Sequence, residues 1–264
     1  MPVIGIDLTD REPRVLVVDE QGRVVGRAAT KGSAAGIASP DGTASMPLPG
    51  AARVTLSVAG AAAVVAETWV GAARGARNAI CLVVGEQVFA GLMLDGRPWT
   101  GAHHRAGAAA WLAVNPVERQ DYRKFGSLAA EVSSKGVARR LSWRIQSGDQ
   151  SAVLERAGDL DAITAQHVFD GARAGDGVAI SVVRDTARYI GMAVATLAAA
   201  IDPEIVVVGG SLAAAADLML DPVRQECARR LSPEALADLR VEFSALGADA
   251  TAIGAARLAM LAPA

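Results

Sequence analysis

The clearest pattern of apolar and polar positions in this chain lies between residues 187 and 212. Ala187–Ile201 is rich in alanine and apolar on most faces, which is typical of a buried helix. Asp202-Pro203 ends this helix, because the residue before a proline avoids the helical region. Glu204–Val208 is dominated by β-branched residues, as in a strand covered on both faces. The next two glycines and Ser211 predict a sharp turn whose serine caps a following helix. These glycines serve either tight strand–helix packing or the close approach of a ligand phosphate or ribose.

Two similar trios of short apolar segments indicate an internal repeat. Each trio reads as strand, loop, strand, acidic-glycine turn and strand, which is the pattern of an antiparallel meander. The first covers Val3–Leu8, Val15–Val18 and Val24–Ala28, and the second covers Ala79–Val84, Val88–Leu94 and Arg97–Trp99. Asp7 and Gly85 fall at equivalent places. The repeat predicts a duplicated α/β architecture with a cleft between the two halves.

The remaining segments alternate between polar loops and apolar helices. We expect a loop over Lys31–Gly50, which is rich in Gly, Ser and Pro, and irregular structure over Asn115–Phe125. The other predicted elements are a strand at Val54–Ser57, helices at Gly60–Ala73, Leu128–Ile145, Thr164–Ala174, Val178–Ile201, 212 to about 231 and Ala250–Leu261, and a strand at Arg240–Phe243.

Composition and charge narrow the class of protein. With 264 residues, of which 52% are hydrophobic and 4% aromatic, the chain can bury a large core of Ala, Val, Leu and Ile. The net charge of −2, without a basic run, argues against nucleic-acid binding. Cys81 and Cys227 are far apart and lack metal-type spacing, so we expect reduced thiols in the cytoplasm. Asp7 and Asp10 interrupt the first apolar segment, so no signal peptide is expected, and Ile190–Ile201 is too short to span a bilayer.

Three features together resemble the ROK family of bacterial sugar kinases and sugar-responsive repressors. They are the repeated meander, Ile6-Asp7 at the end of the first strand, and DPEIVVVGGSL at residues 202–212. LGADATAIGAA at residues 246–256 also looks like the family. The resemblance implies the actin-like ATPase (ribonuclease H-like) fold, an α/β fold with two lobes. It places residues 1–57 and about 250–264 in an N-terminal lobe, shortened between residues 29 and 57, and residues 58–249 in a larger C-terminal lobe.

The resemblance also implies a nucleotide site, which this sequence retains only in part. Its vestigial members are Asp7, as a possible ligand of hydrated Mg²⁺, Gly85 in a second phosphate loop, and Gly209, Gly210 and Ser211 on the adenosine side. Family members carry glycine-rich loops whose bare N–H groups hold phosphate oxygens. Here the two loops read Thr9-Asp10-Arg11 and Glu86-Gln87-Val88-Phe89. We therefore expect weakened ATP binding, with Asp7 either a Mg²⁺ ligand or an acidic residue of a turn.

The catalytic and sugar-binding groups of the family are replaced in this chain. The resemblance puts the general base at Ala59, and alanine cannot accept a proton from a sugar hydroxyl. No Asp or Asn occurs between residues 43 and 67, so this conclusion does not depend on the register. The glutamate that binds sugar hydroxyls in the family falls at Ala108, beside Gly107, which we keep as a substrate-site residue. No catalytic residue is therefore predicted.

The structural zinc site of the family is also predicted to be absent, and no other metal site is expected. The zinc-binding histidine of the family falls at Trp111, and no cysteine lies between residues 115 and 127, where the other ligands would stand. In place of the metal we expect Trp111, Tyr122 and Phe125 to form a small apolar cluster. We interpret the adjacent histidines at residues 103–104 as surface loop residues, since neighbours in sequence cannot easily chelate one ion.

These losses favour a catalytically inactive homologue that acts as a scaffold, a ligand sensor or a partner-binding protein. One alternative is a weakly active, ATP- and Mg²⁺-dependent sugar kinase with relocated groups, for which Asp7, Asp10 and Glu86 are the acids near the cleft mouth. Another is a ROK-type transcriptional regulator that lacks its DNA-binding domain, since the first strand begins at Val3. The resemblance implies a homodimer. We expect no direct DNA binding and no membrane contact, and we leave a sugar or nucleotide ligand open.

Overall fold

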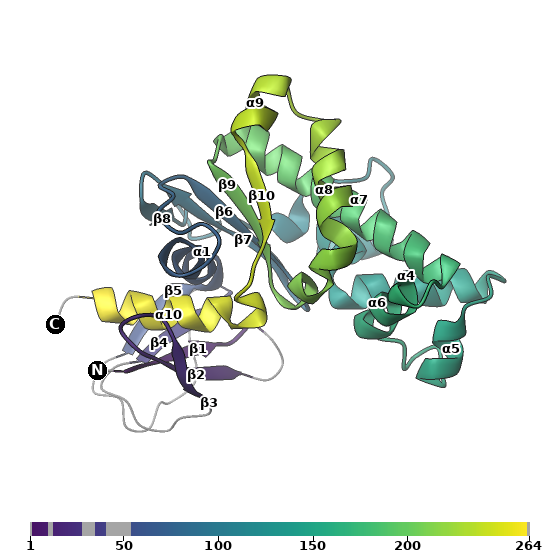
Figure 1. Cartoon of the computed structure of the whole chain (residues 1–264), viewed down its shortest axis with the longest axis horizontal. Coiled ribbons are helices and arrows are strands. Elements are labelled where there is room, and N and C mark those ends of the chain that lie inside the picture. The colour runs from purple at the N-terminus through teal and green to yellow at the C-terminus, as the bar shows by residue number, and fades with distance from the viewer. Residues whose placement is uncertain (1, 10–12, 28–34, 41–53, 263–264) are drawn as a thin grey trace.

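Two five-stranded mixed sheets with the same order of strands form the framework of the molecule (Figure 1). The computed structural model describes residues 2–9, 13–27, 35–40 and 54–262. In each sheet an antiparallel meander is extended by two strands that run parallel to its first strand. The duplication that the two apolar trios predict is therefore confirmed.

The first sheet is built around β1 (Val3–Asp7), which is buried along its whole length. Its partner on one side is β2 (Arg14–Val18), antiparallel, followed by β3 (Val24–Arg27). On the other side lie β4 (Ala35–Ser39) and β5 (Val54–Val58), both parallel. The carboxyl ends of the three parallel strands therefore meet at one edge, which brings the end of β1 close to the residue that follows β5.

The second sheet repeats this arrangement around β6, and its strand order is β8-β7-β6-β9-β10. β6 pairs antiparallel with β7 and parallel with β9, which in turn pairs with β10. The turns after β6 and β9 therefore lie side by side at one edge. The bounds are β6 Ala79–Val84, β7 Val88–Leu94, β8 Arg97–Trp99, β9 Ile205–Gly209 and β10 Arg240–Phe243.

Two helices that cross each other join the sheets. α10 (Ala250–Leu261) packs on β1 and β4 of the first sheet, and α1 (Ala59–Trp69) packs on β6 and β7 of the second. Figure 1 shows both helices between the two sheets. Their backbones touch, because a Cβ built on Gly254 of α10 would lie 1.7 Å from the carbonyl oxygen of Ala62 in α1. The small residues of both helices therefore permit a close crossing.

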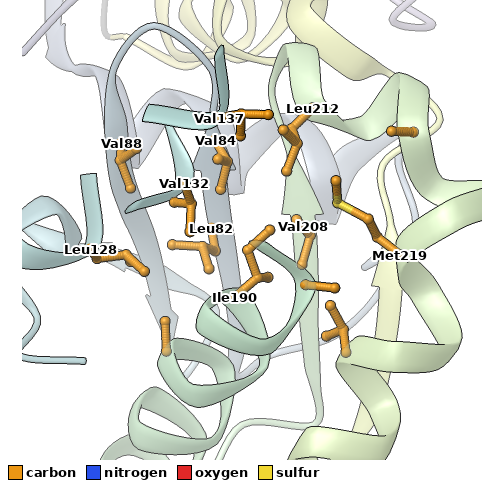
Figure 2. Close-up of a cluster of buried hydrophobic side chains, with 14 of the residues drawn as sticks. Leu82, Val84, Val88, Leu128, Val132, Val137, Ile190, Val208, Leu212 and Met219 are labelled. Carbon is orange, nitrogen blue, oxygen red and sulfur yellow. The ribbon is translucent and has the colours of Figure 1, made fainter. Parts of the chain in front are cut away.

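The main hydrophobic core covers the opposite face of the second sheet. Figure 2 shows Leu82 of β6 and Val208 of β9 facing Ile190 of the long helix α7 (Gly177–Ile201). Helices on either side of α7 complete this core. Among the described helices, none is both long and apolar enough to cross a membrane. The flanking helices are α3 (Ser127–Val132), α4 (Ser134–Gln146), α6 (Ala165–Arg173) and α8 (Ala216–Ala228).

The prediction of a loop over Lys31–Gly50 is wrong for its described part, because that part contains β4. The sequence of β4, AGIAS, has a single β-branched residue, so its local signal is weak. All five residues are buried, and the strand pairs on both sides, with β1 and with β5. Pairing with distant strands, rather than local preference, makes this segment extended.

Several helix boundaries also differ from the prediction. The helix expected over Leu128–Ile145 is divided at Ser133, whose extended backbone ends α3 and whose hydroxyl caps α4 by accepting from the N–H of Gly136 at 3.2 Å. The segment predicted to be irregular, Asn115–Phe125, contains α2 (Gln120–Phe125). Two further short helices were not predicted, α5 (Ala152–Ala157) and α9 (Pro233–Asp238), and serine caps both.

Ser211 does not cap a helix, so the predicted cap is wrong. It is the first residue of a 3₁₀ turn, η2 (Ser211–Ala215), and its side chain makes no capping hydrogen bond. α8 follows at Ala216 and ends at Ala228, so it is shorter than the helix expected from residue 212 to about 231. The tight turn at η2 instead places Ser211 against the turn after β6.

Candidate functional site

Four of the five residues predicted to hold a nucleotide line one small space between the sheets. Asp7 comes from the end of β1, Gly85 from the turn after β6, and Gly210 and Ser211 from the turn after β9. The fifth, Gly209, is the last residue of β9 and is not part of this lining. We call this volume the phosphate space. It measures about 20 Å³, little more than the ~10–15 Å³ that holds one water molecule.

Asp7 stabilises the turn that follows β1. It is 4% exposed, and its Oδ1 accepts hydrogen bonds from the Thr9 N–H at 2.9 Å and the Thr9 hydroxyl at 2.7 Å. An aspartate that accepts from the second residue after it is the usual way to stabilise a turn at a strand end. These contacts match the interpretation of Asp7 as an acidic residue of a turn.

The glycines around the phosphate space hold the two turns together. Gly210 has a φ of +82°, and a Cβ on it would lie 2.5 Å from the carbonyl oxygen of Val84. A Cβ on Gly85 would lie 3.0 Å from the hydroxyl of Ser211. The carbonyl of Gly85 also accepts a hydrogen bond from the N–H of Ser134 at 2.8 Å. The packing of strand ends accounts for these glycines without a ligand.

A nucleoside triphosphate with Mg²⁺ does not fit the phosphate space. Sites for ligands of that size measure ~300–1,000 Å³, whereas this one measures about 20 Å³ and is also lined by the side chains of Gln87 and Phe89. Asp7 is the only acid among its described lining residues, and it is engaged with Thr9. The described residues around this space therefore do not form the cradle that the family resemblance implies, and Asp10 and Arg11 of its first loop lie outside the described residues.

A much larger pocket of about 640 Å³ lies beside this space, and we call it the main pocket. Ala59, Gly107 and Ala108, the positions that the resemblance assigns to the base and the substrate, all line it. No Asp or Glu is among its lining residues in the described part of the chain. The complete lining is Pro40, Val58, Ala59, Gly60, Gln87, Val88, Phe89, Ala90, His103, His104, Arg105, Ala106, Gly107, Ala108, Ala110 and Trp111.

Phe89 separates the main pocket from the phosphate space, because it lines both. It belongs to β7 and packs on a cluster of buried alanines that includes Ala38 and Ala59. Ala59 is the first residue of α1 and is 2% exposed. The position of the family's general base is thus part of an apolar cluster that a phenyl ring covers.

An adjoining pocket of about 670 Å³ shares Gln87, Val88 and Ala110 with the main pocket. It lies between the turn after β6 and the start of α4, and its charged residues are Glu86, Lys135 and Arg139. Asp10, which we also named as an acid near the cleft mouth, lies outside the described residues.

The apolar cluster predicted in place of zinc does not form. Trp111 and Phe125 are 59% and 55% exposed, while Tyr122 is buried. Tyr122 instead donates a hydrogen bond to the buried carboxylate of Glu131. Among the described residues, no three His, Cys, Asp or Glu side chains come together in a way that would hold a metal ion.

Glu131 is the centre of a buried polar network that the sequence did not reveal. Its carboxylate is 2.6 Å from a guanidinium nitrogen of Arg140 and 3.5 Å from one of Arg119. Burial, followed by the hydrogen bond to Glu131, raises the pKa of Tyr122 to about 12. The one signal in the sequence is a glutamate within an otherwise apolar helix, which requires a partner when it is buried.

A model of the ROK family matches residues 53–261 of this chain. The chain belongs to the ROK family. The glucokinase of Halalkalibacterium halodurans is 31% identical over 194 residues, which cover 73% of this chain and 59% of that protein. This ROK chain therefore spans about three fifths of the length of the curated glucokinases that it matches.

Solved structures of ROK proteins share the fold. A ROK family glucokinase from Streptomyces griseus in complex with glucose and AMPPNP superposes with a TM-score of 0.84 at 23% identity, covering 99% of this chain and 100% of that one. A ROK family transcriptional regulator, homologous to the MLC protein of Escherichia coli, gives a TM-score of 0.82 at 19% identity, covering 98% and 78%. The predicted α/β fold of the actin-like ATPase type is confirmed.

The sequence of this ROK protein did not predict that the loop with His103, His104 and Arg105 lines a pocket. The two histidines are exposed, as we predicted for surface loop residues. They nevertheless line the main pocket together with Arg105. Arg105, two residues before Gly107, was the signal in the sequence that this loop brings a positive charge to the pocket.

Proposed function

We propose that this chain is a catalytically inactive homologue of the ROK sugar kinases that binds a small ligand in the main pocket. One observation supports the loss of phosphoryl transfer above the others: Phe89 packs on the buried alanine cluster that contains Ala59, and it also lines the phosphate space. The general base is missing from its position, and the space beside it is too small for the phosphates.

A sensing role has a separate support, which is the difference between the two cavities. The phosphate space is about 20 Å³, while the main pocket keeps about 640 Å³, within the usual range for a small-molecule site. A protein that acted only as a scaffold has no need of an open pocket. We therefore favour ligand binding over a purely structural role.

The proposal is tested by ADP formation with ATP, Mg²⁺ and a panel of hexoses and N-acetylhexosamines. The glucokinase of Halalkalibacterium halodurans is the positive control. Loss of a general base alone lowers a rate by ~10²–10⁴, and an unsuitable phosphate space lowers it further. We expect no sugar-dependent ADP above the blank. The proposal would be overturned by a sugar-dependent ADP-forming activity that copurifies with the protein and that the Asp7→Asn variant lacks.

The similarity to glucokinases favours a second candidate, a weakly active ATP-dependent sugar kinase. In that case an acid near the cleft, Asp7 or Glu86, takes over the missing role. Asp7→Asn and Glu86→Gln would then each reduce turnover, whereas turnover that both variants leave unchanged points to a contaminating kinase.

A further inference from the structure

Among the described residues, Arg105 supplies the one formal charge that lines the main pocket. His103, His104 and Arg105 line one side of it, and no acidic residue lines it in the described part of the chain. Arg105 is exposed and makes no ion pair with a described carboxylate. A concave site with one sign of charge concentrates ligands of the opposite sign.

The loop that carries these side chains is held at both of its ends. The N–H of Ala106 donates to the carbonyl of Thr100 at 2.9 Å, and the carbonyl of Gly107 accepts from the N–H of Ala90 in β7 at 2.7 Å. The side chains of Arg105 and its neighbours therefore start from a fixed backbone, which lowers the entropy lost when a ligand binds.

His104 adds an independent sign of function. It has a φ of +55°, a conformation that residues other than glycine rarely adopt. Its Nδ1 lies 3.0 Å from the hydroxyl of Thr100. When that hydroxyl donates to Nδ1, the proton of the imidazole sits on Nε2, which then serves as a hydrogen-bond donor. Strained backbone of this kind clusters at ligand sites.

We infer that the main pocket binds an anionic monosaccharide, a sugar that carries a phosphate or a carboxylate group. This inference rests on the proposed function for the sugar part of the ligand. The guanidinium of Arg105 and the imidazole of His104 would hold the anion through charge-assisted hydrogen bonds. The exposed ring of Trp111, at the edge of the same pocket, offers an aromatic face for the sugar ring.

The alanines of the pocket support the same selectivity. Carboxylates at positions 59 and 108, where the family resemblance expects them, would repel a second anion in the pocket. This chain has alanine at both positions. The pocket thus has alanine at both of these positions and the guanidinium of Arg105 among its lining residues, and both features favour an anionic over a neutral sugar.

The experiment is calorimetry without nucleotide, with glucose 6-phosphate, glucuronate, glucose and inorganic phosphate as separate titrants. We expect at least one of the two sugar anions to bind at least 10-fold more tightly than glucose and than inorganic phosphate, and the comparison of the two identifies the anionic group. The inference would be overturned if glucose or inorganic phosphate bound as tightly as the sugar anions. It would also be overturned if neither sugar anion bound.

Two variants assign the selectivity to the pocket. Arg105→Gln should weaken the sugar anion at least 10-fold, while Arg156→Gln, an exposed arginine on α5, should leave its affinity unchanged. Ala108→Glu, at an exposed position, restores a carboxylate and should also weaken the anion at least 10-fold. Unchanged affinity in both pocket variants, with melting temperatures equal to the wild type, would overturn the inference. ADP formation in the separate turnover assay would overturn the proposed function while leaving the anion selectivity intact.

Discussion

The crossing of α1 and α10 allows a sharp test, the substitution Gly254→Ala. A Cβ at this position would lie 1.7 Å from the carbonyl oxygen of Ala62 and 2.5 Å from its carbonyl carbon. The obstacle is backbone, so no side chain can rotate away. To reach an ordinary contact of 3.4 Å, the helices must separate by roughly 1.7 Å at this point.

The expected cost follows from two opposing effects. Alanine improves the helical preference of an interior glycine position by about 1 kcal/mol. Overpacking of a tight core costs about 1–3 kcal/mol and more when the backbone has to move. The separation also loosens the contacts of Ala252 and Ala255, which are fully buried in α10. We therefore expect a net loss of about 1–2 kcal/mol in the free energy of unfolding, or about 2–8 °C in Tm for a chain of this size.

Urea unfolding followed by circular dichroism measures this loss, and Gly177→Ala is the matched control. Gly177 is the first residue of α7, and a Cβ there would meet nothing within 4 Å. The control should be as stable as the wild type or slightly more stable. If Gly254→Ala is as stable as the wild type, or if the control loses as much, the close crossing is not the cause and the reasoning fails.

Three further predictions concern titratable groups whose pKa values are shifted by their surroundings. Burial raises the pKa of Glu67, and the hydrogen bond from Ser244 offsets this only in part. Glu67→Gln should therefore flatten the pH dependence of the free energy of unfolding above pH 4.5. The wild type therefore loses stability as the pH rises through this range, and urea melts that show the same slope in both proteins would contradict this. Absorbance at 295 nm should show Tyr122 ionising with a pKa of about 12, which burial raises first and the hydrogen bond to Glu131 second. Glu131→Ala should lower this pKa by removing the second cause, and an unchanged pKa would contradict the contribution of Glu131. Asp176→Ala should cost about 1–2 kcal/mol at pH 7, because Asp176 caps α7. Burial acts to raise the pKa of Asp176, but its hydrogen bonds outweigh burial and lower the pKa overall. The difference in the free energy of unfolding between Asp176→Ala and the wild type should therefore shrink as the pH falls below 3.8. A difference that does not change with pH would contradict this prediction.

The strands of the second sheet could be predicted from the sequence because their signal is local. Ala79–Val84 and the run before Gly209 are apolar and rich in β-branched residues, and both strands are buried along their whole length. β4 was missed because Ala35–Ser39 has no such signal and is extended only through its neighbours in the sheet. Short helices such as α9 were missed because a single turn with a serine cap is too short for a periodic pattern.

For the candidate site, the sequence and the family resemblance gave the identity of the residues but not their packing. That position 59 is an alanine is visible in the sequence, while its cover by Phe89, 30 residues away in the second sheet, needs the structure. The same holds for Glu131 and Arg140, which α3 and α4 bring together across the break at Ser133. The predicted cluster of Trp111, Tyr122 and Phe125 failed because Tyr122 is buried and donates a hydrogen bond to Glu131, while the other two rings lie on the surface.

The position of Phe89 bears on how such a chain would change over evolutionary time. A reversal at Ala59 alone would introduce a carboxylate beneath a phenyl ring, in surroundings that oppose its ionisation. A reversal at Phe89 alone would remove the packing that the neighbouring alanines rely on and would supply no proton acceptor. Because Phe89 packs on the cluster that contains Ala59, the effects of changes at the two positions are not expected to add. On the proposed function, a lineage with this arrangement is therefore expected to acquire new ligands rather than to regain phosphoryl transfer.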